Sequence, residues 1–195
     1  HPNRGIETIT YLIHGDREHS DSLGNKGVIK DGCCQWMTAG SGIIHQELPR
    51  AVPHLLGAQL WLNLPKECKM AEPAYRDIQA ADVPVINEGE AEIRVISGHY
   101  KDTQGAVQGG YTKMAYLDVA LEPGKEWTLD TETNDNLFIY IVRGDACFEK
   151  GGEVYQSRQA ILFDKGSSLF VKAGGEGARF LLLSGASLNE PVAWG

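Results

Sequence analysis

The chain lacks any apolar run approaching the roughly 20 residues that a membrane-spanning helix needs. It also lacks clustered positive charge, because 18 basic residues stand against 26 acidic ones and the formal net charge is −8. Binding to nucleic acid depends on clustered Lys and Arg. These absences predict a soluble protein that has neither a membrane nor a nucleic acid as a direct partner.

Cysteine is also scarce, and the four that occur show no CxxC spacing: Cys33, Cys34, Cys68 and Cys147. The adjacent pair cannot bridge to itself without strain, so we expect reduced thiols and a cytoplasmic location, or a nuclear one in a eukaryote. Only Lys30 stands near the adjacent pair to lower a thiol pKa. We therefore interpret Cys33 and Cys34 as buried structural thiols and not as a redox sensor.

Short runs of β-branched and aromatic residues, separated by glycine turns, dominate the local pattern. Residues 7–13 and 137–142 are examples, and 23 glycines are spread through the 195 residues. This pattern is typical of strands in a sandwich or barrel. Only residues 73–80 suggest a brief helix.

An internal repeat indicates two domains. Tyr-Leu-Ile-His-Gly-Asp at residues 11–16 recurs as Tyr-Ile-Val-Arg-Gly-Asp at residues 140–145. A second strand-like block follows each copy, at residues 33–42 and 159–168. We predict two tandem β-domains, residues 1–80 and 81–195, with a crossover in the charged and proline-rich segment 65–84.

Histidine is confined to the first hundred residues, at His1, His14, His19, His45, His54 and His99. Aligning the two halves on their repeated blocks sets four residues opposite four others: His1 and Asp130, Asn3 and Glu132, His45 and Val171, Glu47 and Ala173. The second half is therefore expected to have no metal site.

The first half holds a candidate metal-binding set. Residues i and i+2 of a strand share one face, so His1 lies with Asn3, and His45 lies with Glu47. Imidazole nitrogens with one carboxylate and open positions suit Fe(II) and similar divalent metals. Asn3 weakens the set, because a neutral amide oxygen is a poor ligand for a transition metal. The alternative interpretation is that both pairs are polar surface residues.

Several segments together resemble the pirin family. His-Pro-Asn-Arg-Gly-Ile-Glu-Thr-Ile-Thr-Tyr at residues 1–11 resembles the pirin signature His-Pro-His-Arg-Gly-Phe-Glu-Thr-Val-Thr-Tyr. Residues 35–47, 60–65 and 69–73 also resemble pirin segments, so the resemblance spans nearly the whole chain. Pirins usually carry further strands before the first motif and a further segment after the last, and by that pattern this chain looks clipped at both ends.

The resemblance implies an all-β bicupin, with two tandem cupin barrels of the jelly-roll type and an iron-like ion in the first barrel alone. Carried onto this sequence, the metal positions are His1, Asn3, His45 and Glu47. Asn3 replaces a family histidine, which puts full-strength metal binding in doubt and leaves open that no metal is bound. His14 and His19 are expected to face solvent, so neither is expected to compensate.

The resemblance also implies two activities of different class. The first is a quercetin 2,3-dioxygenase, in which a flavonol binds the ion and Glu47 acts as a ligand and as the base that takes the substrate's hydroxyl proton. The alternative is a non-catalytic regulatory protein that binds a transcription factor or a metabolic enzyme. A small-molecule isomerase or a carbohydrate-binding cupin is a third interpretation.

Three remaining features receive structural interpretations. Trp36 and Trp61 are expected to be core residues. Residues 40–42, Gly-Ser-Gly, are expected to form a turn that positions His45 and not a nucleophile elbow. The mixed charges of residues 16–21 suggest a solvated loop.

Overall fold

The computed structural model describes residues 1–192, so the last three residues of the predicted second domain lie outside the described part. Regular structure in the described part is almost entirely strand, apart from the short helices η1 (Lys66–Cys68) and η2 (Ala80–Asp82). The all-β prediction is confirmed. None of the helices within residues 1–192 has the length and apolar character needed to cross a membrane.

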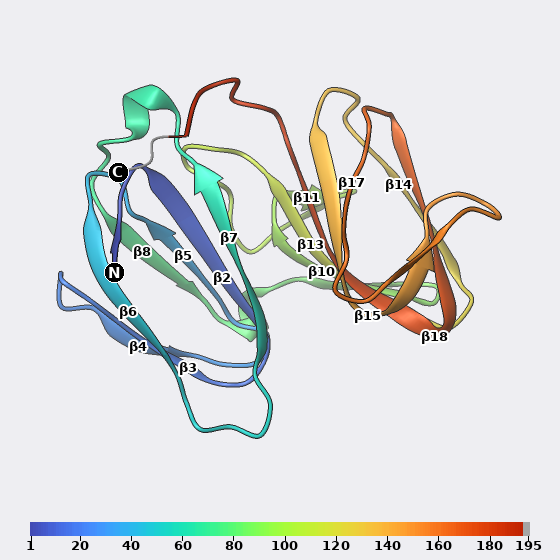
Figure 1. Cartoon of the computed structure of the whole chain (residues 1–195), viewed down its shortest axis with the longest axis horizontal. Coiled ribbons are helices and arrows are strands. Elements are labelled where there is room, and N and C mark those ends of the chain that lie inside the picture. The colour runs from blue at the N-terminus through green and yellow to red at the C-terminus, as the bar shows by residue number, and fades with distance from the viewer. Residues whose placement is uncertain (193–195) are drawn as a thin grey trace. The chain divides into compact units, whose positions relative to one another are not determined.

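The chain forms two compact units (Figure 1). The first comprises His1–Asp82, Gly110–Thr112 and the segment that begins at Leu188. The second comprises Val83–Gly109 and Lys113–Ser187. The C-terminal segment is tied to the first unit by hydrogen bonds from the Asn63 side chain to the backbone oxygens of Glu190 and Pro191.

Two antiparallel sheets build the first unit. One has the strand order β1 (Pro2–Asn3), β6 (Ile43–Pro49), β3 (Arg17–Asp21), β4 (Lys26–Ile29). The other has the order β7 (Leu56–Asn63), β2 (Ile6–His14), β5 (Cys34–Thr38), β8 (Ala74–Ile78). Strand β2 is buried along all but its last residue, which suits its β-branched and aromatic sequence.

Two segments of the first unit differ from their predicted conformation. Residues 74–78 form strand β8 and not a helix, because they pair with β5 along its whole length. Residues 17–21 form strand β3 and not a solvated loop, because they pair on both sides, with β4 and β6. In both cases pairing with a distant strand outweighs the local sequence preference.

A larger sheet builds the second unit. Its strand order is β16 (Val154–Gln156), β15 (Asn136–Cys147), β18 (Ser168–Gly185), β13 (Ala115–Leu121), β10 (Ala91–Ser97), β9 (Val85–Glu88). Beside this order, β14 (Glu126–Asp130) pairs with β18, and β17 (Ala160–Leu162) pairs with β15. The short strands β11 (His99–Tyr100) and β12 (Thr103–Gln104) pair with each other.

The internal repeat corresponds to strands β2 and β15. Its shared glycines, Gly15 and Gly144, have φ angles of +109° and +70°, a backbone region that residues other than glycine rarely adopt. A Cβ on Gly144 would also lie 1.9 Å from the carbonyl oxygen of Gly177. The repeat therefore marks a glycine with positive φ directly after β2 in the first unit and within β15 in the second.

Candidate metal centre in the first unit

Strands β1 and β6 bring three of the four predicted metal-binding residues together. The backbones of His1 and His45 exchange hydrogen bonds of 3.0 and 3.1 Å, so the two residues lie directly opposite each other. Their Nε2 atoms are 2.8 Å apart, and Asn3 Nδ2 lies 2.9 Å from His45 Nε2. Asn3 and His45 are buried, with 6% and 3% of their surface exposed.

The two imidazole nitrogens of His1 and His45 are spaced as two ligands of one divalent ion would be. Two nitrogens bound to one ion at about 2.1 Å, in adjacent coordination positions, lie about 3 Å apart. A half-turn of the Asn3 amide would replace Nδ2 by the oxygen Oδ1, an exchange that leaves the shape of the side chain unchanged. Burial lowers the pKa of His45 below its usual value, which favours the neutral imidazole that metals bind.

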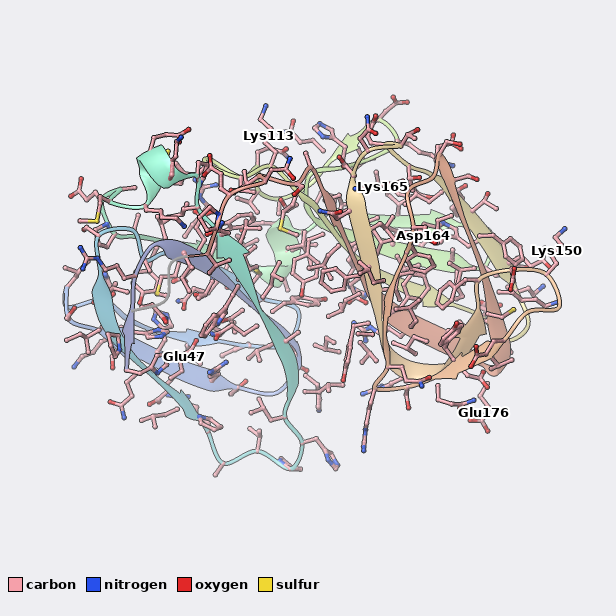
Figure 2. All side chains as sticks on the ribbon, turned by 45° about the horizontal axis from the view of Figure 1, so that its top comes forward. Glu47, Lys113, Lys150, Asp164, Lys165 and Glu176 are labelled. Carbon is pink, nitrogen blue, oxygen red and sulfur yellow. The ribbon has the colours of Figure 1, made fainter. Side chains whose placement is uncertain are left out.

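The carboxylate of Glu47, the fourth predicted residue, has other partners. Arg17 donates to Oε2 at 2.5 Å, Gln59 donates to both carboxylate oxygens at 3.0 Å, and Thr10 donates to Oε1 at 3.3 Å. Within residues 1–192, no group of three or more His, Cys, Asp or Glu side chains is arranged to hold a metal ion. The carboxylate of Glu47, labelled in Figure 2, is thus held by Arg17, Gln59 and Thr10.

The residues that hold Glu47 were not predicted from the sequence. Arg17 stood in the predicted loop, and nothing singled out Thr10 or Gln59. One signal was available: Arg17 and His19 alternate with Glu18, as inward and outward residues of a strand do. Strand β3 sets His19 opposite Glu47, so Arg17 and His19 lie beside the β6 residues that carry the site.

The two histidines predicted to face solvent differ from each other. His14 is half exposed, and its Nδ1 pairs with Asp31 at 2.8 Å. His19 is only 6% exposed, so the prediction for this residue is wrong. Its position on β3 between two neighbouring strands buries it, which could not be foreseen while residues 16–21 were taken for a loop.

The tryptophan and cysteine predictions have mixed outcomes. Trp36 is a core residue, whereas Trp61 is 49% exposed and is not. All four cysteines are free thiols, and burial raises the pKa of Cys34 to about 12, which makes it unreactive. Residues 40–42 form the predicted turn between β5 and β6.

Strand register changes the predicted correspondence between the halves. Val171 pairs with Trp127 as His45 pairs with His1, so the counterpart of His1 is Trp127 and not Asp130. The alignment was wrong by three residues because the connection from β14 to β15 is three residues longer than the connection from β1 to β2. Two positions that correspond to the candidate metal-binding residues, Trp127 and Val171, are buried apolar side chains in the second unit.

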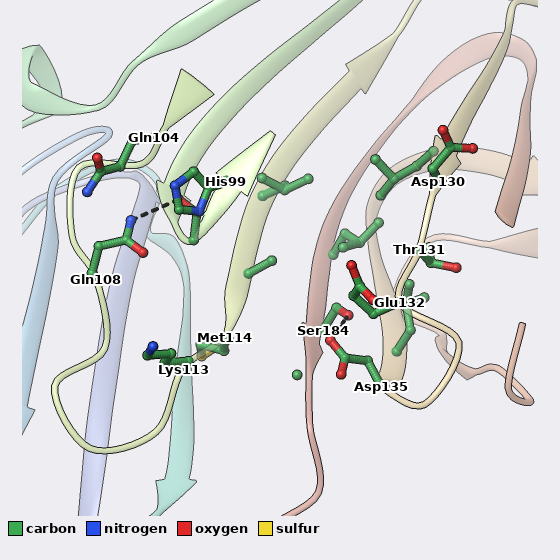
Figure 3. Close-up of a pocket in the computed structure, with 17 residues that line it drawn as sticks. His99, Gln104, Gln108, Lys113, Met114, Asp130, Thr131, Glu132, Asp135 and Ser184 are labelled. Carbon is green, nitrogen blue, oxygen red and sulfur yellow. Dashed lines mark hydrogen bonds between the residues drawn. The ribbon is translucent and has the colours of Figure 1, made fainter. Parts of the chain in front are cut away.

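The second unit has a cavity of about 580 Å³ at one end of its sheet (Figure 3). Asp130 and Glu132 line this cavity, with Lys113 and His99 on the opposite wall in the close-up. The floor includes Leu182 and other leucines. The volume lies within the usual range of small-molecule pockets. Two of the four residues that the sequence alignment set opposite the candidate metal-binding residues, Asp130 and Glu132, therefore line a cavity, whereas Val171 and Ala173 do not line it.

Comparison with known proteins assigns the fold to a class and the chain to a family. The family model described as pirin matches residues 1–62, and that of the pirin C-terminal cupin domain matches residues 116–195. A crystal structure of quercetin 2,3-dioxygenase from Acinetobacter baumannii is 34% identical, with a TM-score of 0.91 over 100% of this chain and 70% of that chain. The fold is therefore that of a two-domain cupin.

Sequence relatives extend this result. Pirin-1 of Arabidopsis thaliana is 36% identical over 198 residues, which cover 98% of this chain and 68% of that protein. The chain belongs to the pirin family. Bacterial pirin YhhW from Escherichia coli, solved in complex with nickel(II), is 22% identical with a TM-score of 0.73, over 96% of this chain and 76% of that chain, and shares the fold.

Proposed function

We propose that this protein is a metal-dependent dioxygenase of the quercetin 2,3-dioxygenase type, acting on a flavonol, with Fe(II) as the expected ion. The observation that carries the proposal is the partly buried contact between the Nε2 atoms of His1 and His45, 2.8 Å apart, with the buried Asn3 amide beside them. The name of the similar Acinetobacter baumannii structure gives the reaction.

His1 and His45 would hold the ion through Nε2, and Asn3 would add a weak oxygen donor. A bound divalent ion would supply a Lewis acid for the deprotonated hydroxyl and the neighbouring carbonyl of a flavonol. Glu47 would accept the proton of that hydroxyl at Oε1 or Oε2. Thr10, Arg17 and Gln59 orient the carboxylate and hold it inside the barrel, which restricts its access to water.

Metal content tests the centre itself. The protein should be purified without chelator or affinity nickel, and its metal measured by mass spectrometry beside the variants His45→Ala and Asn3→His. We expect metal in the wild type, little in His45→Ala, and more in Asn3→His, because a third imidazole replaces a weak amide donor. Metal that is equal in wild type and His45→Ala would place the ion elsewhere.

Turnover tests the reaction. Oxygen uptake with quercetin should be followed after loading with Fe, Mn, Ni, Co or Cu. We expect uptake with at least one metal, and its loss in His45→Ala. Metal-loaded protein that takes up no oxygen with any of the five would remove the dioxygenase proposal.

A second candidate is a non-catalytic protein that binds a regulatory or metabolic partner. Two observations favour it: Asn3 replaces a histidine of the family signature, and Glu47 is engaged by Arg17 and Gln59. A barrel without catalysis can lose metal donors at no cost to binding. Two results together would favour this candidate. The wild type would be isolated without metal, and the Asn3→His variant would bind metal but show no oxygen uptake.

A further inference from the structure

The first unit buries a histidine for which the fold gives no hydrogen-bonding partner. His19 is only 6% exposed, and within the described residues neither Nδ1 nor Nε2 has a hydrogen bond. A buried polar group without a partner costs about 1–3 kcal/mol, and native proteins rarely leave one. The role of this ring is therefore not explained by folding alone.

His19 lies on the inner face of the sheet that carries the candidate metal centre. The register of β3 and β6 pairs His19 with Glu47 and Asp21 with His45. Directly paired residues place their side chains on the same face, about 5 Å apart at Cβ. His19 is thus one strand away from the proposed base, inside the same barrel.

The ring of His19 is held in place without using its nitrogens. Tyr75 stacks on it with ring centroids 5.8 Å apart and an interplanar angle of 22°. Gly27, its partner on β4, leaves room for it, because a Cβ there would lie 2.4 Å from Nε2. Asp77 Oδ1 lies 3.9 Å from Nε2, which is too long for a hydrogen bond. Packing fixes the ring while both nitrogens remain unused.

We infer that His19 is a specificity-determining residue that hydrogen-bonds a hydroxyl of the aromatic substrate, remote from the hydroxyl and carbonyl that bind the metal. The inference rests on the proposed function, because it assumes that a flavonol enters this barrel. Metal binding by His19 is a poorer explanation, because its ring leans over Gly27 on β4, away from the strand that carries His45 and Glu47.

The test compares two flavonols that share the metal-binding groups. Quercetin carries further hydroxyls on both ring systems, whereas 3-hydroxyflavone carries none. Dissociation constants would be measured on the metal-loaded protein by quenching of tryptophan fluorescence. We expect the wild type to prefer quercetin by about tenfold, the equivalent of one buried hydrogen bond. The variant His19→Phe keeps a ring for Tyr75 but no nitrogen, and should lose this preference while binding 3-hydroxyflavone as before.

Two further variants control the result. His19→Gln keeps hydrogen-bonding atoms and should retain part of the preference, and it serves as the second variant if His19→Phe does not fold. His14→Phe removes an exposed histidine and should change neither constant. An undiminished preference in His19→Phe, or an equal loss for both flavonols, overturns the inference and leaves the proposed function standing. Failure of both flavonols to bind the wild type overturns the proposed function and the inference together.

Discussion

The two units belong to one cupin family but fill their interiors differently. In the first, polar side chains are buried between the sheets, among them Asn3, Thr10, His19, Gln35 and His45. In the second, Trp127 stacks with Tyr100 and packs against Phe180 in one continuous apolar cluster. The apolar core of the first unit includes smaller clusters around Met37 and Leu12.

The buried polar groups of the first unit and the buried aromatic groups of the second have opposite effects on stability. Buried polar groups cost free energy unless they are paired, whereas burying an aromatic side chain contributes several kcal/mol. Trp127 stands where the first unit has His1, so one position carries an imidazole in one barrel and a buried core residue in the other.

The largest expected effect comes from removing the aromatic side chain that fills the second barrel. Trp127→Ala should lower the free energy of unfolding of that unit by about 3–5 kcal/mol. The indole is 5% exposed, and its Nε1 donates to the Tyr100 hydroxyl at 3.1 Å, a bond that would also be lost. Calorimetry would measure the loss. The matched control is Trp61→Ala in the first unit, where a 49% exposed indole should cost less than about 1 kcal/mol. Equal losses would contradict the division of roles.

The next effect concerns the polar interior of the first barrel. Arg17→Gln removes a positive charge beside the proposed metal position and releases one of the hydrogen bonds that hold Glu47. We expect the affinity for nickel(II) or zinc to rise about tenfold, equivalent to about 1.4 kcal/mol. Competition with a chromophoric chelator would measure it. Arg50→Gln is the control, because Arg50 pairs with Glu18 at an exposed position. An unchanged affinity would show that Arg17 does not restrain Glu47.

The sequence was sufficient to predict the fold class and the proximity of His1, Asn3 and His45. Alternation along short strands fixed the pairs His1 with Asn3 and His45 with Glu47, and the family signature joined them. The restraint of Glu47 by Arg17 could not be predicted, because it requires β3 to pair with β6, and a charge-rich run of five residues looks like a loop.

The second half shows the same limit. A glycine-containing repeat located the two central strands, but it could not fix the register of β14 against β18. The alignment therefore assigned Asp130 to a position that Trp127 occupies. Register depends on the connections and on packing, and a shift of a few residues leaves the local sequence pattern of each strand unchanged.

The smallest expected effect is a pH dependence of stability from a buried carboxyl in the first unit. Glu7 is 2% exposed on β2, and burial raises its pKa above the usual value of 4.5, opposed by a hydrogen bond from Thr38. The pKa of Glu7 is higher in the folded state than in the unfolded state, so protonation of Glu7 stabilises the fold. This contribution is complete below the unfolded-state pKa and is lost as pH rises through the folded-state pKa. Glu7→Gln keeps the size of the side chain and removes the titration. Relative to this variant, the wild type should gain a few degrees in Tm as pH falls from 7 toward 4.5.

The control Glu176→Gln changes an exposed carboxylate of the second unit, labelled in Figure 2, and should leave the pH profile of Tm unchanged. A parallel course of Tm against pH in wild type and Glu7→Gln would show that the polar groups of the first barrel do not titrate with folding.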